Sequence, residues 1–100
     1  MSDWSVYVIR CADNSLYTGI TTDVARRFQQ HSEGRGGARY LQGRTPLTLE
    51  FSLPVGDRSQ ASRVEFRLKQ LNKSEKERFL RQPKRLCDHI AGLLEEPVVR

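Results

Sequence analysis

This sequence of 100 residues lacks any long apolar run and any basic leader segment. No apolar stretch approaches the roughly 20 residues that a membrane-spanning helix needs, so we expect no membrane partner. The first residues, Met1 to Trp4, carry no basic side chain and lead into no long apolar run. They do not resemble a secretory signal, and we expect the protein to act in the cytoplasm.

Cysteine is too scarce to hold the fold together through disulfides. Cys11 and Cys87 are the two cysteines, and neither has a second cysteine or a histidine at the spacing of a metal site. A disulfide framework in so short a chain needs more cysteines, and thiols stay reduced in the cytosol. We therefore expect two reduced thiols.

Acidic residues are also few relative to basic ones. Twelve aspartates and glutamates stand against 17 lysines and arginines, for a net charge of +5 and a sequence pI of about 9.7. This balance favours polyanionic partners, nucleic acid above all. Aromatic residues form 8% of the chain, which argues against disorder. The length fits one domain, which we place at residues 1–96, with residues 97–100 as a tail.

The first part of the chain predicts an antiparallel hairpin. Residues 4–11 are rich in β-branched and aromatic side chains on both faces, which is typical of a central strand. Residues 12–15 favour a turn because Asp and Asn tolerate left-handed conformations. The chain then returns as a second strand over residues 16–21.

A helix and a third strand follow the hairpin. The helix begins near Val24, capped by Thr22 or Asp23, and ends before Gly34. The third strand covers residues 47–55 and ends at Pro54. Its alternation predicts a half-buried strand with one apolar face, made of Leu47, Leu49, Phe51 and Leu53.

The second half of the chain predicts helices. Asp57 or Ser59 caps a helix whose apolar positions recur at helical spacing, at Ala61, Val64, Leu68 and Leu71. Ser74 and Glu77 have the spacing of a capping box that opens a short helix.

Pro83 limits that short helix, and an amphipathic helix over residues 86–94 closes the chain. The order is strand–strand–helix–strand–helix–helix–helix. We predict an α+β fold in which a small three-stranded antiparallel sheet is flanked by helices.

One set of residues resembles a known family. It consists of Ser5-Val6-Tyr7, Tyr17-Thr18-Gly19, Arg27, His31 and Glu65. This set resembles the GIY-YIG nuclease superfamily over residues 4–80, although Ser5, Val6 and Thr18 depart from the letters that name its two motifs. The stretches YTGITTDVARRFQQH and PVGDRSQASRVEFRLKQLNKSEK are similar to small stand-alone bacterial members, the YhbQ-like (UPF0213-type) proteins.

The resemblance implies an endonuclease that hydrolyses phosphodiester bonds in DNA, branched or damaged DNA included, in repair or recombination. It implies a tyrosine general base, for which we favour Tyr7, with Tyr17 orienting water or phosphate and His31 helping or substituting. Paired strands lie about 5 Å apart, so the two phenols can converge. A free tyrosine has a pKa near 10 and needs a nearby cation to act as a base. The alternative for all three side chains is ordinary packing.

Gly19, Arg27 and Glu65 complete the expected site. Gly19 would allow a close approach of the backbone, and Arg27 can donate two hydrogen bonds to a phosphate. Glu65 is the candidate ligand for one Mg²⁺ or Mn²⁺ ion, since Mg²⁺ prefers oxygen and can be held by one carboxylate with substrate phosphate. The alternative for Glu65 is a salt bridge to Lys69, four residues further on.

Further basic side chains could follow a phosphate backbone. No element is expected to read base edges, so weakly selective or structure-selective binding is the prediction. The alternative is a solvated basic surface. The nucleic-acid-binding candidates are Arg35, Arg39, Arg44, Arg63, Lys69 and Lys73.

Two other functions stay open at this point. A nucleic-acid-binding module with weak or no catalysis would carry the same basic residues. A protein-interaction role would use the apolar face of the last helix, residues 86–94. We expect a monomer, with a homodimer as the alternative.

Overall fold

The computed structural model describes residues 3–34 and 39–95, and its elements follow the predicted order in an α+β fold. The connection between the first helix and the third strand holds a short 3-10 helix that the sequence pattern does not predict. The elements are β1 (Trp4–Arg10), β2 (Leu16–Thr21), α1 (Val24–Glu33), the 3-10 helix (Arg39–Leu41), β3 (Thr48–Gly56), α2 (Arg58–Lys69), α3 (Lys73–Arg81) and α4 (Pro83–Glu95).

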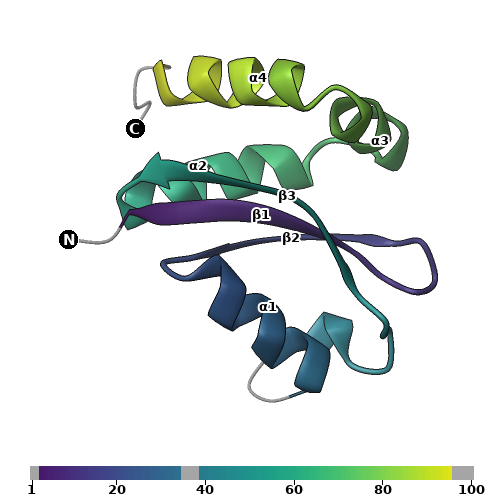
Figure 1. The fold of residues 1–100 in the computed structure, drawn as a ribbon. Helices are drawn as coiled ribbons and strands as arrows, with labels where there is room; N and C mark the ends of the chain where they lie inside the picture. The colour runs from purple at the N-terminus through teal and green to yellow at the C-terminus, as the bar shows by residue number, and fades with distance from the viewer. Residues whose placement is uncertain (1–2, 35–38, 96–100) are drawn as a thin grey trace.

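The three strands form one antiparallel sheet in the order β2-β1-β3. β1 is therefore the central strand, as its apolar residues on both faces predict. Figure 1 shows α1 on one side of the sheet and α2 with α4 on the other. The residues from Ser5 to Ile9 are all buried, because helices or loops cover both faces of this strand.

Two apolar clusters lie on opposite faces of the sheet. Successive side chains of a strand point to opposite faces, so Val6 and Tyr7 belong to different clusters. The cluster under α2 and α4 contains Val6, Val55, Ala61, Val64, Leu68, Leu86 and Ile90. The cluster on the α1 face contains Tyr7, Ile9, Cys11 and Leu41. Tyr7 is thus a buried core residue on the α1 face of the sheet.

The apolar face of α4 is used inside the molecule. Leu86, Ile90 and Leu93 are each at most 3% exposed, and the first two belong to the cluster shared with α2. The alternative in which this face binds another protein is therefore wrong. Within residues 3–34 and 39–95, no helix combines the length and the apolar character needed to cross a bilayer.

β3 differs from the prediction in two places. Val8 of β1 pairs with Phe51, whereas the next residue, Ile9, pairs with Leu49, because a bulge shifts the register here. Neighbouring residues of β1 face opposite ways, so Phe51 and Leu49 lie on opposite faces, and the prediction of one continuous apolar face is wrong. The strand also continues past Pro54, which an edge strand tolerates because one of its sides needs no donor.

Capped ends fix the helices that carry the candidate site. Asp23 caps α1 by accepting a hydrogen bond from the backbone N–H of Arg26 at 3.1 Å, and Asp57 caps α2. α1 ends at Gly34, whose φ of 73° is left-handed and suits glycine. The start of α1 at a fixed residue determines which way Arg27 projects.

The cap of α3 differs from the prediction. Asn72 and Glu75 form the capping box, so the box predicted from Ser74 and Glu77 is wrong. Both pairs have the required spacing of three residues, and the helix begins two positions earlier than the Ser74 cap would allow. Pro83 ends α3, as predicted, and is the first residue of α4, where its missing N–H costs nothing.

Arg10 joins the end of β1 to α3 and β3. Its guanidinium donates to both carboxylate oxygens of Glu77, at 2.8 and 2.6 Å, and to Glu50 on β3. The hydrogen bonds from Arg10, with a second contribution from Lys73, lower the pKa of Glu77 from 4.5 to about 2. Glu77 is thus a tertiary anchor rather than a cap.

We predict that Glu77→Gln lowers the free energy of unfolding at pH 7 by about 1–2 kcal/mol, because Arg10 loses a charged partner. A depressed pKa stabilises the fold above pH 4.5, and this contribution is lost as the pH falls toward 2. Denaturant unfolding from pH 7 down to pH 2 should show the wild type converging on the variant. Glu95→Gln, at an exposed position, is the control. A difference that stays constant over this pH range contradicts the prediction.

Candidate active site

Tyr7 and Tyr17 lie on adjacent strands, and their rings meet on the α1 face of the sheet. Tyr7 pairs with Gly19 across the hairpin, and Tyr17 pairs with Ile9. The centroids of the two phenol rings are 6.3 Å apart. The ring of His31, from α1, lies 5.9 Å from that of Tyr7 and 5.7 Å from that of Tyr17. We call Tyr7, Tyr17 and His31 the ring cluster.

Gly19 leaves room for the ring cluster. A Cβ atom at this position would lie 2.5 Å from the Tyr7 hydroxyl oxygen and 3.1 Å from Cε2 of Tyr17. Tyr7 is 2% exposed and packed on all sides, so it cannot move away cheaply. The glycine is required here for space rather than for an unusual backbone conformation.

The Tyr7 hydroxyl lies 2.9 Å from Nε2 of His31. The positive charge of Arg27 lies close enough to Tyr7 to lower its pKa, against the larger effect of burial. A phenol O–H can donate to the lone pair of a neutral imidazole, so a Tyr7 proton directed at His31 requires Nε2 to be the unprotonated ring nitrogen.

Burial controls the protonation of the ring cluster. It raises the pKa of Tyr7 from 10 to about 12, and the neighbouring Tyr17 adds to the rise, although Arg27 acts in the opposite direction. Burial also lowers the pKa of His31 below its usual 6.5, with the positive charge of Arg27 acting in the same direction. At neutral pH the pair is therefore a neutral phenol beside a neutral imidazole.

Arg27 and Glu65 lie on two different helices, and the charges of both affect the pKa of Tyr7. Arg27 is half-buried on α1, and its Nη1 donates to Oε1 of Gln30 at 3.2 Å. Glu65 on α2 lies close enough for its charge to raise the pKa of Tyr7. Its carboxylate is also 3.3 Å from Nζ of Lys69, so the predicted salt bridge is present.

The donor set suits only some metal ions. Among residues 3–34 and 39–95, no three His, Cys, Asp or Glu side chains gather at one point. A zinc site draws three or four ligands from the protein, whereas Mg²⁺ is commonly held by one or two carboxylates with waters and substrate phosphate. Glu65 as a single carboxylate therefore fits an ion of the Mg²⁺ type that binds with the substrate.

The two lysines expected to bind nucleic acid both carry ion pairs. Lys69 pairs with Glu65, and Nζ of Lys73 lies 2.7 Å from Glu77. Both lysine side chains are about half exposed, at 52% and 51%. Exposed pairs of this kind are weak and screened by salt, so a phosphate can compete for either lysine.

The predicted arginines have different surroundings. Arg44 forms an ion pair with Asp13 in the turn between β1 and β2, so it holds two loops together. Arg39 is exposed, and Arg63 is partly buried on α2. Arg35 lies outside the described residues.

Tyr40 also contacts the ring cluster, although no motif in the sequence predicts a role for it. Its ring stacks on Tyr17, with centroids 5.8 Å apart and an interplanar angle of 26°. The guanidinium of Arg44 lies 4.3 Å from the centroid of the Tyr40 ring. The one feature of the sequence that could have indicated a role for Tyr40 is its position between Arg39 and Arg44. Gln30 was also missed, although its spacing of three residues from Arg27 could have indicated the contact.

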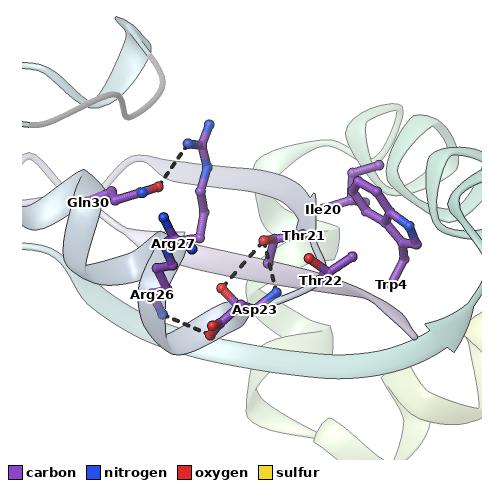
Figure 2. Close-up of a pocket in the computed structure, with 8 residues that line it drawn as sticks. All are labelled: Trp4, Ile20, Thr21, Thr22, Asp23, Arg26, Arg27 and Gln30. Atoms are coloured by element: carbon purple, nitrogen blue, oxygen red, sulfur yellow. Dashed lines mark hydrogen bonds between the residues drawn. The ribbon is translucent and has the colours of Figure 1, made fainter. Parts of the chain in front are cut away.

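An open pocket of about 380 Å³ adjoins Arg27. In Figure 2, Trp4 and Ile20 lie at one end of the pocket, and Arg27 extends toward Gln30 at the other. Arg26 lines the same pocket. Arg27 therefore borders a recess large enough for part of a substrate.

Comparison with known proteins places this geometry in a family. Residues 3–78 match the family model described as the GIY-YIG catalytic domain. The UPF0213 protein YhbQ of Escherichia fergusonii is 55% identical over 93 residues, which cover 93% of this chain and 92% of that protein. A YhbQ protein of Escherichia coli is 54% identical over the same coverage.

A solved structure agrees with this match. The solution NMR structure of the UPF0213 protein BH0048 from Bacillus halodurans is 38% identical, covers 80% of this chain and 84% of its own, and has a TM-score of 0.52. The matched residues 3–78 include the ring cluster, Arg27 and Glu65, and the match supports a nuclease-type function in general. The chain belongs to the GIY-YIG family, among its UPF0213 members.

Proposed function

We propose that this protein is a metal-dependent endonuclease that hydrolyses phosphodiester bonds in DNA at the ring cluster. The observation that carries the proposal is the Tyr7 hydroxyl, 2.9 Å from Nε2 of His31 and close enough to Arg27 for the positive charge of that residue to offset part of the rise in the pKa of Tyr7. A phenol between a neutral imidazole and a fixed cation can move a proton beside a group that stabilises negative charge. Branched or damaged DNA, in repair or recombination, is the substrate setting that the family resemblance implies.

In this proposal, the general base is a pair of residues. The raised pKa keeps Tyr7 protonated, so Tyr7 does not act as a free tyrosinate. The attacking water gives a proton to the Tyr7 oxygen while the Tyr7 proton passes to Nε2 of His31. Tyr7 stays neutral, His31 becomes cationic, and the hydroxide attacks the phosphorus. The P–O bond to the leaving sugar oxygen breaks, that oxygen takes a proton from solvent water, and His31 returns its proton to solvent. Arg27 offsets the negative charge that develops on the phosphate oxygens.

Glu65 and Tyr17 take supporting roles. Glu65 would hold one Mg²⁺ or Mn²⁺ ion together with oxygens of the substrate phosphate. When bound, this ion supplies Lewis-acid stabilisation of the charge on the phosphate. Tyr17, held in place by its stack on Tyr40, orients the water or the phosphate.

We predict that Glu65→Gln and Arg27→Ala each lower kcat/KM for DNA cleavage in Mg²⁺ by about a hundredfold or more. Lys69→Met is the matched control, because it removes the same salt bridge while leaving the Glu65 carboxylate. We expect it to change kcat/KM by less than about tenfold, since exposed ion pairs contribute little. Thermal unfolding should show all three variants folded.

Two outcomes contradict the proposal. Cleavage that is undiminished in both Glu65→Gln and Arg27→Ala points to a contaminating nuclease. Tight, salt-dependent binding of DNA without cleavage in either Mg²⁺ or Mn²⁺ favours the nucleic-acid-binding module instead.

The pair of residues also predicts a pH profile. His31 must be neutral to accept the proton, so kcat/KM should fall as the pH drops through the pKa of His31, which lies below 6.5. Tyr7 must be protonated, so no second fall is expected until the pH nears 12. The profile should therefore be flat from about pH 7 to 10. A rate that rises tenfold per pH unit over this range would indicate a simple tyrosinate base.

We predict that Gly19→Ala lowers the free energy of unfolding by about 1–3 kcal/mol and reduces cleavage, because the new Cβ displaces the Tyr7 hydroxyl. Tyr7→Phe removes the atom of closest contact, so the double variant should be more stable than the sum of the single effects predicts. Gly92→Ala is the control, since nothing lies within 4 Å of its Cβ position. Additive effects of Gly19→Ala and Tyr7→Phe on stability would contradict the proposed contact.

A further inference from the structure

The pocket beside Arg27 has no task in the proton transfer described above. Its volume of about 380 Å³ falls in the range of about 300–1,000 Å³ in which small ligands bind. Figure 2 shows that its walls come from β1, from the end of β2 and from the first turns of α1. We name it the Trp4 pocket. It shares Arg27 with the candidate active site, so a ligand in it would lie next to the phosphate that is cut.

The two ends of the Trp4 pocket differ in chemistry. Trp4 and Ile20 form an apolar end, and the guanidinium of Arg58 lies 5.5 Å from the centroid of the Trp4 ring. Arg26 and Arg27 supply positive charge at the other end. An aromatic face on which a base stacks and cations that track its phosphate are the two features with which proteins hold single-stranded nucleic acid.

The threonines and Asp23 lie between these ends. The carboxylate of Asp23 caps α1 and lies on the pocket wall, so its negative charge repels phosphate from that part of the pocket. Arg26 and Arg27 outnumber it, and the pocket keeps a net positive charge. The Thr21 hydroxyl accepts a hydrogen bond from the Asp23 N–H, whereas Thr22 is exposed, so its hydroxyl can meet a sugar or a base edge. Charge therefore orients a nucleotide with its phosphate toward the arginines.

We propose that the Trp4 pocket receives one unpaired nucleotide of the strand that is cut, with its base against Trp4 and its phosphate next to Arg26. This inference rests on the proposed function, because Arg27 serves both the pocket and the phosphate at the ring cluster. A base inside a duplex has both faces covered by its neighbours, so only an unpaired or extruded nucleotide can present a face to Trp4. The preferred substrate is therefore DNA with a single-stranded nucleotide beside the cleavage position.

The first test uses the fluorescence of Trp4, which is the only tryptophan in the sequence. The wild-type protein is titrated in EDTA, where no metal-dependent cleavage occurs. The probes are a short single-stranded oligonucleotide and a blunt hairpin duplex of the same sequence. We expect the single strand to quench Trp4 and to bind at least about fivefold more tightly than the duplex. Equal quenching by both probes, or none by the single strand, would overturn the proposal.

The second test uses variants and a labelled single strand followed by anisotropy. Trp4→Ala and Arg26→Ala should each weaken binding by about fivefold or more, and Arg26→Ala should lower the salt slope by about 0.7. Trp4→Phe keeps a ring and should bind more tightly than Trp4→Ala. Arg81→Ala removes an exposed arginine of α3 outside the pocket and is the matched control.

Trp4 packs against the core, so Trp4→Ala can fail to fold. In that case the affinity of Arg26→Ala for the single strand is the deciding measurement, because Arg26 is exposed and its removal leaves the core intact. Binding by Arg26→Ala that is as tight as binding by Arg81→Ala overturns the proposal.

Cleavage assays separate this inference from the proposed function. Quenching by single strands and weak binding by Arg26→Ala, without cleavage in Mg²⁺ or Mn²⁺, would support the Trp4 pocket and remove the nuclease proposal. Cleavage of a blunt duplex as fast as that of a single-stranded flap would leave the nuclease proposal intact and overturn the role of the Trp4 pocket. Faster cleavage of the flap, lost in Arg26→Ala but not in Arg81→Ala, supports both.

Discussion

The close approach of the Tyr7 ring to Gly19 constrains much of this molecule. The two residues pair directly across β1 and β2, and the phenol crosses the strand at a point where no Cβ atom fits. This position brings the hydroxyl to His31 and within reach of Arg27. A slip of one residue in the hairpin would turn Tyr7 to the face covered by α2 and α4 and dissolve the ring cluster. The candidate chemistry therefore depends on the register of one hairpin.

Local patterns predicted most of the fold, and contacts distant in sequence account for the errors. Strand and helix periodicities indicated each main element, and the turn residues indicated the hairpin. The bulge in β3 lies between Leu49 and Phe51 and depends on pairing with β1, some 40 residues away. The local alternation of apolar residues does not reveal it. Glu77 looked like a capping residue because its partner Arg10 is 67 residues distant. Two overlapping sequence patterns, Asn72 with Glu75 and Ser74 with Glu77, have the spacing of a capping box for α3. The first pair forms the box, and Glu77 pairs with Arg10 instead.

The members of the site were easier to predict than their protonation. Spacing indicated that the tyrosines, Arg27 and His31 share one face, whereas how near the charge of Glu65 comes to Tyr7 depends on how α2 packs. Arg27 near Tyr7 would suggest a lowered pKa, yet burial outweighs the cation and raises it. Burial is a property of the packed molecule and cannot be summed from residue types. For this reason the sequence left the identity of the base open, and the phenol–imidazole pair is a proposal that rests on the packed structure.

Tyr17 is linked to the molecular surface by a chain of direct contacts. Asp13, in the solvent-exposed turn of the hairpin, holds Arg44, whose guanidinium covers Tyr40, and Tyr40 in turn stacks on Tyr17. Sequence drift in an exposed turn is ordinarily neutral, because its side chains touch little else. Here the turn braces a side chain of the ring cluster, so selection on the candidate site would extend to a surface aspartate outside it.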